Sequence, residues 1–100
     1  MSAPMSMTTN LHDEARVPYF FWDRNVTVAE LREILADASN PDRIPLLRVL
    51  LREARPDDAL LFVSPATIAA EWERVAPGLG RQRAFWQWLL GKWRELGYLP

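Results

Sequence analysis

The stretch IPLLRVLLREA, residues 44–54, decides the fold. Seven of its eleven residues are apolar, and at the helical spacing they cover more than half of the circumference. A helix that is apolar on so many sides is usually the buried centre of its domain. Arg48 and Arg52, four residues apart, mark its solvent edge, and Asn40-Pro41 upstream is a typical helix start. We therefore expect the other elements to pack around this helix.

A second helix is predicted on the N-terminal side, over residues 27–38. Thr27 and Glu30 form a capping-box pattern, in which the hydroxyl and the carboxylate each accept a hydrogen bond from a backbone amide of the first turn. The apolar residues that follow recur at helical spacing and share one face. They are Val28, Leu31, Ile34, Leu35 and Ala38. This face is expected to pack against the central helix.

Another helix is predicted on the C-terminal side, after a short helical turn over residues 57–62. Ser64-Pro65 is its start signal, and the sequence PGLG, residues 77–80, ends it near residue 76. Its core face is formed by Ile68, Trp72 and Val75.

The last predicted helix covers residues 81–96, with Gly97 as its C-terminal cap. On a helical wheel it has one broad apolar face, with Leu90 at the margin. The members of this face are Phe85, Trp86, Leu89, Trp93 and Leu96. Trp88 falls on the other side, among charged residues, so the wheel predicts that it points away from the core.

The residues before these helices divide into two parts. Residues 1–16 are polar and lack a core pattern, so we expect a flexible tail. Residues 17–24, VPYFFWDR, hold four consecutive aromatic side chains, too many for one face of a helix. We expect an extended or turn-like lead segment that its aromatic side chains pin onto the helices that follow. Since no strand pattern appears, the predicted fold class is all-α, a compact bundle of about four helices plus a short helical turn, in a single domain over residues 17–100.

The composition is typical of a small globular protein. One hundred residues make one domain at most, and 49% of them are hydrophobic. No apolar run approaches the 18 residues of a membrane span, and residues 1–16 lack the apolar core of a secretory signal. The chain has no cysteine, so disulfides and thiolate metal sites are excluded. We expect a cytoplasmic protein with no membrane contact and no cofactor.

The inventory of catalytic side chains is poor, so we expect no enzymatic activity. The only histidine, His12, lies in the predicted tail, whereas a serine nucleophile needs a positioned base. Ser64 is explained as a helix cap. Asp57 and Asp58 are explained as carboxylates at a helix N-terminus, where the helix dipole favours negative charge.

The charge of the C-terminal half is bipolar. Residues 56–79 carry four acids and one arginine, a net of −3, whereas residues 80–100 carry four cations and one acid, a net of +3. The cations of the last helix are Arg81, Arg83, Lys92 and Arg94. Together with Trp88 they form the candidate partner-binding site, because a tryptophan on a charged face is a typical interface anchor.

Two alternative functions stay open for this chain, and one alternative placement stays open for Trp88. A small nucleic-acid-binding regulator would hold phosphates with the same cations and stack bases on the aromatics, although the chain has no dominant basic field. A structural subunit of a larger assembly is another reading, and an exposed tryptophan also leaves self-association open. In the plainest reading, Trp88 is a rim residue covered by the aromatic lead segment.

The segment Tyr19-Phe20-Phe21-Trp22-Asp23 carries a family resemblance. Followed by Thr27 and Leu31-Arg32, it resembles the N-terminal motif of small bacterial proteins that are encoded beside AbiEii-type nucleotidyltransferases, the toxins of toxin–antitoxin pairs. The likeness continues through PDRI at residues 41–44, LLREAR at 50–55 and FWQWL at 85–89, and it covers residues 18–96. The aromatic–Trp–Asp element is its most specific part.

The resemblance implies an antitoxin role exerted by contact with a nucleotidyltransferase. Such an enzyme holds metal ions with carboxylates in an open cleft, and the basic terminal helix is suited to cover an acidic cleft. Antitoxins with a winged-helix DNA-binding domain are known for this toxin class, but this sequence has no strands for a wing. We interpret Trp22 as a core plug and Asp23 as a turn cap, with direct partner contact as the alternative.

Overall fold

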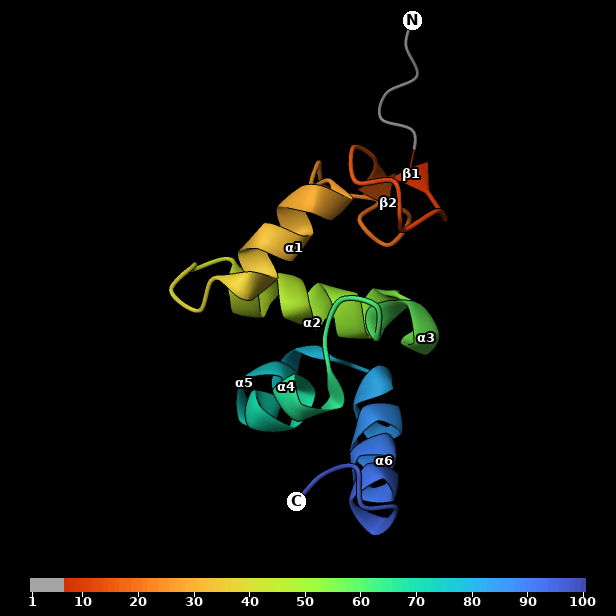
Figure 1. The fold of residues 1–100 in the computed structure, drawn as a ribbon, viewed down its shortest axis with the longest axis vertical. Coiled ribbons are helices and arrows are strands. Elements are labelled where there is room, and N and C mark those ends of the chain that lie inside the picture. The colour runs from red at the N-terminus through yellow and green to blue at the C-terminus, as the bar shows by residue number, and fades with distance from the viewer. Residues whose placement is uncertain (1–6) are drawn as a thin grey trace, which may run out of the picture.

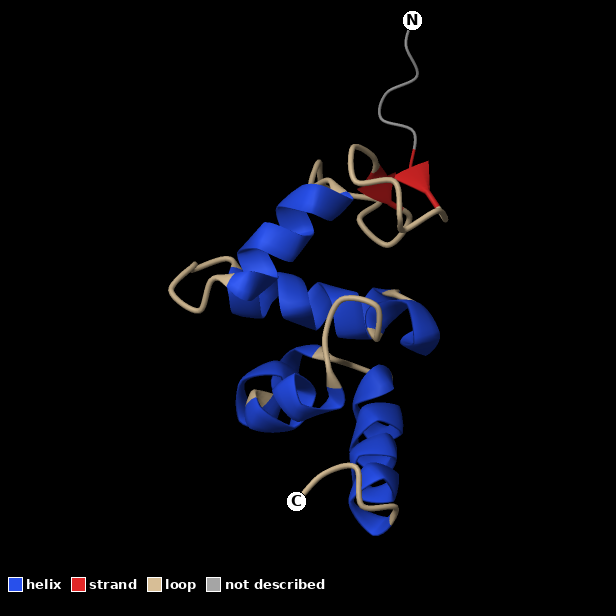
Figure 2. Cartoon of the chain, viewed as in Figure 1, coloured by secondary structure: helices blue, strands red, loops and turns tan. Residues whose placement is uncertain are grey.

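The structure is a computed structural model that describes residues 7–100 (Figure 1). Two short strands, β1 (Met7–Thr8) and β2 (Val17–Pro18), pair in parallel at the start of this part of the chain. The rest is helical or looped (Figure 2), so the predicted all-α class is confirmed. The helices are α1 (Val28–Ala36), α2 (Arg43–Glu53), α3 (Pro56–Ala59), α4 (Pro65–Ala70), α5 (Trp72–Val75), the 3-10 turn η1 (Ala76–Gly78) and α6 (Gln82–Glu95).

Helix α2 is the centre of the core, as the sequence predicts. The N-terminal segment and α1 lie on one side of it, and α4, α5 and α6 lie on the other (Figure 1). Its buried side chains are Leu46, Leu47, Val49, Leu50 and Leu51. The helix begins at Arg43, later than Asn40-Pro41 suggested, because a turn comes first in which the Asn40 side chain accepts a hydrogen bond from the Asp42 amide (2.8 Å).

The two arginines at the edge of α2 donate hydrogen bonds to backbone carbonyls of the α5–η1 segment. Arg48 Nε donates a hydrogen bond to the carbonyl of Arg74 (2.9 Å), and Arg52 Nη1 donates to the carbonyl of Gly78 (3.2 Å). Both carbonyls belong to the end of the α5–η1 segment, where helical carbonyls lack partners within the helix. A Cβ on Gly78 would lie 2.6 Å from Arg48 Cδ, so a larger residue there would have to displace the Arg48 side chain.

Helix α1 has the predicted capping box at its start. The Thr27 hydroxyl accepts from the Glu30 amide (3.1 Å), and the Glu30 carboxylate accepts from the Thr27 amide (2.9 Å). Val28 and Leu31 are fully buried, as the stripe predicts. The helix ends at Ala36, so the predicted last member of the stripe, Ala38, is exposed and outside the helix.

The single helix predicted over residues 65–76 is wrong in one respect, because it is broken at Glu71 into α4 and α5. Ser64 caps α4 as predicted, since its hydroxyl accepts from the Thr67 amide (3.1 Å). At the break, the Glu71 carboxylate forms an ion pair with Arg43 of α2, and both side chains are largely buried. This contact depends on the position of α2 and therefore leaves no trace in local periodicity.

Residues 7–16 contradict the predicted flexible tail. Leu11 is 3% exposed and belongs to the core, and the Glu14 carbonyl accepts a hydrogen bond from the Ala29 amide (3.0 Å). The segment also contributes β1, although the sequence predicts no strand. Backbone hydrogen bonds can hold a polar segment without any hydropathy pattern, which is why the sequence misses this packing. The remainder of the predicted tail, residues 1–6, lies outside the described residues.

The lead segment, residues 17–24, is pinned by its aromatics as predicted. Phe20 and Phe21 are buried, and their rings meet edge to face with centroids 4.9 Å apart. Tyr19 contacts the α2–α3 junction: its hydroxyl donates to Asp58 (2.6 Å) and accepts from the Arg55 amide (2.9 Å). Burial, reinforced by the hydrogen bond to the Asp58 carboxylate, raises the pKa of Tyr19 to about 12.

Trp22 is not the predicted core plug, because it is 67% exposed. Two successive turns carry it outward, closed by hydrogen bonds from the Phe21 amide to the Pro18 carbonyl (3.0 Å) and from the Arg24 amide to the Phe21 carbonyl (3.3 Å). The next residue, Asp23, accepts a hydrogen bond from the Arg24 guanidinium (3.2 Å), which lowers its pKa. Phe21 and Trp22 are adjacent in sequence, but the first is buried and the second is exposed.

Candidate partner-binding surface

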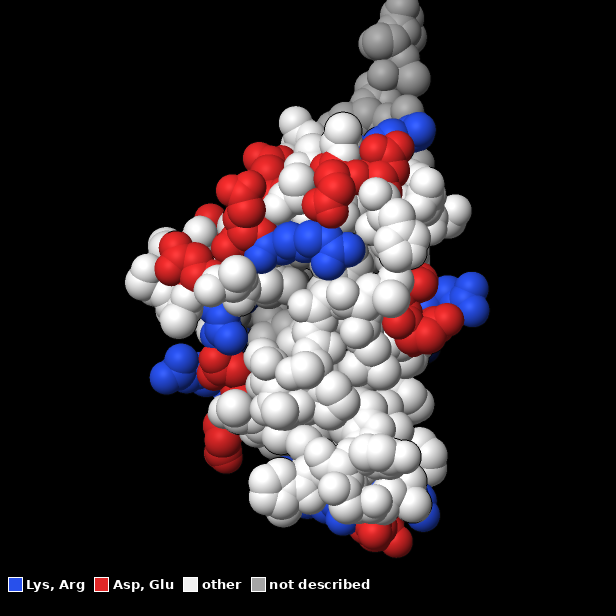
Figure 3. All heavy atoms as spheres, viewed as in Figure 1, with Lys and Arg blue, Asp and Glu red and all other residues white. Residues whose placement is uncertain are grey.

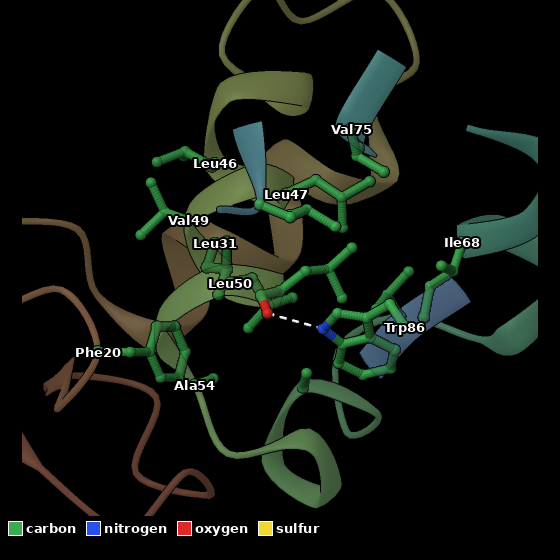
Figure 4. Packing of buried hydrophobic residues seen from close by; sticks show 14 of the residues in the cluster. Phe20, Leu31, Leu46, Leu47, Val49, Leu50, Ala54, Ile68, Val75 and Trp86 are labelled. Atoms are coloured by element: carbon green, nitrogen blue, oxygen red, sulfur yellow. Dashed lines mark hydrogen bonds between the residues drawn. The ribbon is translucent and has the colours of Figure 1, made fainter. Parts of the chain in front are cut away.

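Helix α6 is attached to the core by a tryptophan. Trp86 is fully buried, and its indole Nε1 donates a hydrogen bond to the Leu51 carbonyl (2.8 Å; Figure 4). Leu51 lies in the last turn of α2, where a carbonyl has no partner within the helix. The indole therefore fills an apolar site and also satisfies a buried acceptor, which fixes the rotation of α6 about its own axis.

The buried stripe of α6 is rotated from the predicted face. Trp86 and Leu90 are buried, whereas Phe85, Leu89 and Trp93 are partly buried. Leu90, expected at the margin, is therefore central. Leu96, expected in the core, follows the end of the helix and is 68% exposed. The helical wheel gives the mean direction of all apolar side chains of the helix. In the structure, the buried face is the one centred on Trp86 and Leu90.

Trp88 points away from the core, as the wheel predicts. It is 57% exposed, and within the described residues the only aromatic ring that it meets is that of Phe85, at a centroid distance of 6.2 Å. The reading in which the aromatic lead segment covers Trp88 is therefore wrong. The lead segment packs on the opposite side of α2 from α6 (Figure 1).

The four cations of the candidate site divide into two pairs around α6. At 3.6 residues per turn, Arg81 and Lys92 lie about 20° and 40° from Trp88, whereas Arg83 and Arg94 lie about 140° and 120° away. Arg94 indeed borders a groove that is also lined by α4 and the C-terminal residues. This geometry places Trp88, Arg81 and Lys92, here called the outer face of α6, on one side of the helix together with Glu95, and it places the other pair away from them.

Most of these cations have no charge partner within residues 7–100. Arg81, Arg83 and Arg94 make no ion pair in the part of the chain that the structure describes, and Lys92 lies 3.6 Å from Glu95 in an exposed pair. The first turn of α6 contains no acid and no side-chain cap. Cations at a helix N-terminus are opposed by the helix dipole, so Arg81 and Arg83 are placed where they do not help the helix.

An uncharged surface lies beside this helix. Residues 59–70, 84–91 and 96–100 contain no charged side chain, and Figure 3 shows a broad white area over the α4–α6 half of the molecule, with the charges gathered at its borders. Large exposed apolar side chains in these segments include Leu61 and Tyr98. The periodicity of single helices does not reveal this surface, whereas the three uncharged runs of the sequence indicate it.

The motif residues 19–23 divide in the structure between support and exposure. Tyr19, Phe20 and Phe21 hold the lead segment in place, whereas Trp22 and Asp23 face solvent. No group of three or more His, Asp or Glu side chains within residues 7–100 is placed to hold a metal ion. None of the helices in this range is both long and apolar enough to cross a membrane.

Comparison with protein-family models, with curated proteins and with solved structures finds no match to this chain.

Proposed function

We propose that this chain is a non-enzymatic protein-binding module that contacts its partner through the outer face of α6. The observation that carries the proposal is Trp88, which stands 57% exposed between Arg81 and Lys92 on a helix that is held rigidly by Trp86. Tryptophan and arginine are the residues most enriched among interface hot spots, and they act best when a rigid scaffold presents them.

The fold itself gives no reason for this arrangement. Trp86 already anchors the helix, so a second large ring on the outside adds little to the core. Leaving a tryptophan in water costs part of the favourable free energy that its burial would supply. A partner that covers Trp88 would recover this free energy and place its own acids against Arg81 and Lys92.

The partner we propose is a nucleotidyltransferase, with this chain as its antitoxin-like counterpart. The proposal rests on the resemblance of the Tyr19–Asp23 segment and on the charge of α6, which complements an acidic, metal-binding cleft. Trp22 and Asp23, the exposed members of that segment, are available as a second contact.

A small nucleic-acid-binding regulator is the second candidate, and it is favoured by Arg81, Arg83 and Arg94, which make no ion pair within the described part of the chain. Phosphate binding releases counterions, so its affinity falls steeply as salt rises. Protein binding centred on Trp88 would depend much less on salt, because apolar burial contributes most of it.

The first test is co-purification of this chain with the product of its adjacent gene, with the mass of the complex measured by light scattering. A stable complex is expected, and Trp88→Ala should weaken it at least tenfold, as is usual for a hot-spot residue. A lone particle would contradict the antitoxin proposal, and titration with nucleic acid at two salt concentrations would then test the second candidate.

The two cation pairs supply a matched control within one helix. Arg81→Glu with Lys92→Glu changes the charge by the same amount as Arg83→Glu with Arg94→Glu. If the outer face binds the partner, the first pair of substitutions weakens the complex more than the second. Equal loss from both pairs would indicate general attraction by net charge, and no loss from either would overturn the proposed site.

A further inference from the structure

A recess lies at the edge of the uncharged surface, where α1, α2 and α4 converge. Its volume is about 270 Å³, and it opens on the face drawn in Figure 3, where basic side chains border it. Leu35, Leu47, Phe62 and Val63 form its apolar walls. Its charged lining residues are Arg32 and Arg43, and none of the lining residues is acidic.

Both guanidinium groups are held in place by the fold. Arg43 Nε donates to the Leu35 carbonyl at the end of α1 (3.1 Å), and Arg43 Nη1 pairs with Glu71. Arg32 Nε pairs with Glu14 (3.0 Å), and its guanidinium carbon lies 4.7 Å from the centroid of the Phe62 ring. Neither side chain has to give up much conformational freedom to bind a ligand, so the arginines are preorganised.

Donors remain unused on both arginines. A guanidinium has five N–H groups, and Nη2 of Arg43 and Nη1 of Arg32 make no hydrogen bond in the part of the chain that the structure describes. In the described residues, every fully buried side-chain nitrogen has a hydrogen-bond partner. The two Nη groups without a partner are therefore not fully buried. Thr67, whose hydroxyl accepts from Ser64 (3.0 Å), lines the same recess.

We infer that this recess binds a carboxylate attached to a small apolar body. The unused Nη donors of Arg32 or Arg43 would hold the carboxylate by a charge-assisted hydrogen bond, and the walls around Phe62 would take the apolar part. The volume lies just below the range of about 300–1,000 Å³ that is typical of ligand pockets, which limits the ligand to a single ring or a short chain. The inference does not depend on the proposed function, because it concerns a different face of the protein.

The carboxylate can come from a free organic acid or from an acidic side chain beside an apolar one in a protein. Phenylacetate is the probe for the first source, with phenylacetamide as its neutral control. The capped dipeptide acetyl-Phe-Glu-amide is the probe for the second, with acetyl-Phe-Gln-amide as its control. Binding is followed on the full chain by NMR, from the shifts of the Arg32 and Arg43 Nε–H signals and of the amides of residues 62–64.

We expect the acids to shift these signals and the neutral controls to bind at least tenfold more weakly, which is the value of a charge-assisted hydrogen bond. Arg32→Gln should weaken acid binding by a similar factor, whereas Arg24→Gln, an exposed arginine outside the recess, should leave it unchanged. If phenylacetate binds more tightly than the dipeptide, the source is a free acid, and the reverse order indicates a protein side chain.

Ala36→Met is the second variant, because Ala36 is an exposed lining residue at the end of α1 and a methionine there would fill the recess without removing a charge. It should abolish binding while the chain stays folded. The inference is overturned if neither acid shifts the signals, if the neutral controls bind equally well, or if Arg24→Gln weakens binding as much as Arg32→Gln.

Discussion

Helices α1 and α6 are stabilised in opposite ways. Helix α1 satisfies its own first turn through Thr27 and Glu30 and buries both Val28 and Leu31. Helix α6 is longer, but it has no side-chain cap and no acid in its first turn. What holds it is Trp86, whose indole fills the core and bonds to α2.

The difference is between a helix whose polar groups are used within the fold and a helix that leaves much of its surface free for a partner. In α1 the polar groups at the start are used within the helix, so few are left for a partner. In α6 the cations Arg81 and Arg83 oppose the helix dipole, and Trp88 stands in solvent. An element attached by one deep anchor can keep the rest of its surface for binding, at some cost to its own stability.

The contrast between α1 and α6 depends most on Trp86, the anchor of α6. Trp86→Ala should lower the free energy of unfolding by about 3–5 kcal/mol, because it opens a cavity and leaves the Leu51 carbonyl without a donor. The matched substitution Trp88→Ala, on the other side of the same helix, should change it by about 0.5 kcal/mol or less. Urea denaturation of both variants measures this, and similar losses would contradict the assignment of the two rings.

Tyr19 tests whether the lead segment, on the other side of α2 from α6, is held by an anchor of the same kind as Trp86. Tyr19→Phe should lower the free energy of unfolding by about 1–3 kcal/mol, because the Arg55 amide and Asp58 both lose their partner. Tyr98→Phe, at an exposed tyrosine, is the control and should be close to neutral. A loss below that of the control would show that the hydroxyl is replaced by water at no cost.

The same tyrosine predicts a dependence on alkaline pH. Its pKa is raised from 10.0 to about 12 in the folded chain, so the neutral phenol is favoured by folding. This contribution is complete below pH 10 and is lost as the pH rises from 10 towards 12. Melting temperatures measured from pH 9 to 12 should fall more steeply for the natural chain than for Tyr19→Phe, and parallel curves would contradict the raised pKa.

The capping box tests the local stability of α1. Thr27→Ala should cost about 1 kcal/mol, because the Glu30 amide loses its acceptor. Thr27→Ser keeps the hydroxyl and should recover most of this loss. Thermal melts followed by circular dichroism compare the two variants, and an equal loss from both would mean that the methyl group rather than the cap stabilises the helix.

The smallest expected effect is a gain at the start of α6. Arg81→Asp places a capping acid at the N-cap position and removes a cation opposed by the dipole, so the free energy of unfolding should rise by about 0.5–1 kcal/mol. The same change should weaken the proposed partner complex, because Arg81 lies on the same side of the α6 axis as Trp88. A variant that is stabilised and still binds fully would sharpen the comparison by limiting the site to Trp88 and Lys92.

Local signals in the sequence determined much of this protein. The capping box at Thr27, the cap at Ser64 and the apolar arc of residues 44–54 predict the starts and the centre of the helical core, and the wheel predicts that Trp88 points outward. These features depend on neighbours within one or two turns, so that periodicity and side-chain chemistry are sufficient to find them.

Only the tertiary structure decided which residues each element meets. Leu11 packs into the core from a segment with no apolar pattern, Trp22 is exposed although Phe20 and Phe21 just before it are buried, and Glu71, at the break between α4 and α5, pairs with Arg43. Each of these outcomes depends on an element far away in the sequence. The recess between Arg32 and Arg43 arises in the same way, because periodicity assigns side chains to a face of one helix, whereas a pocket requires several helices at fixed relative positions.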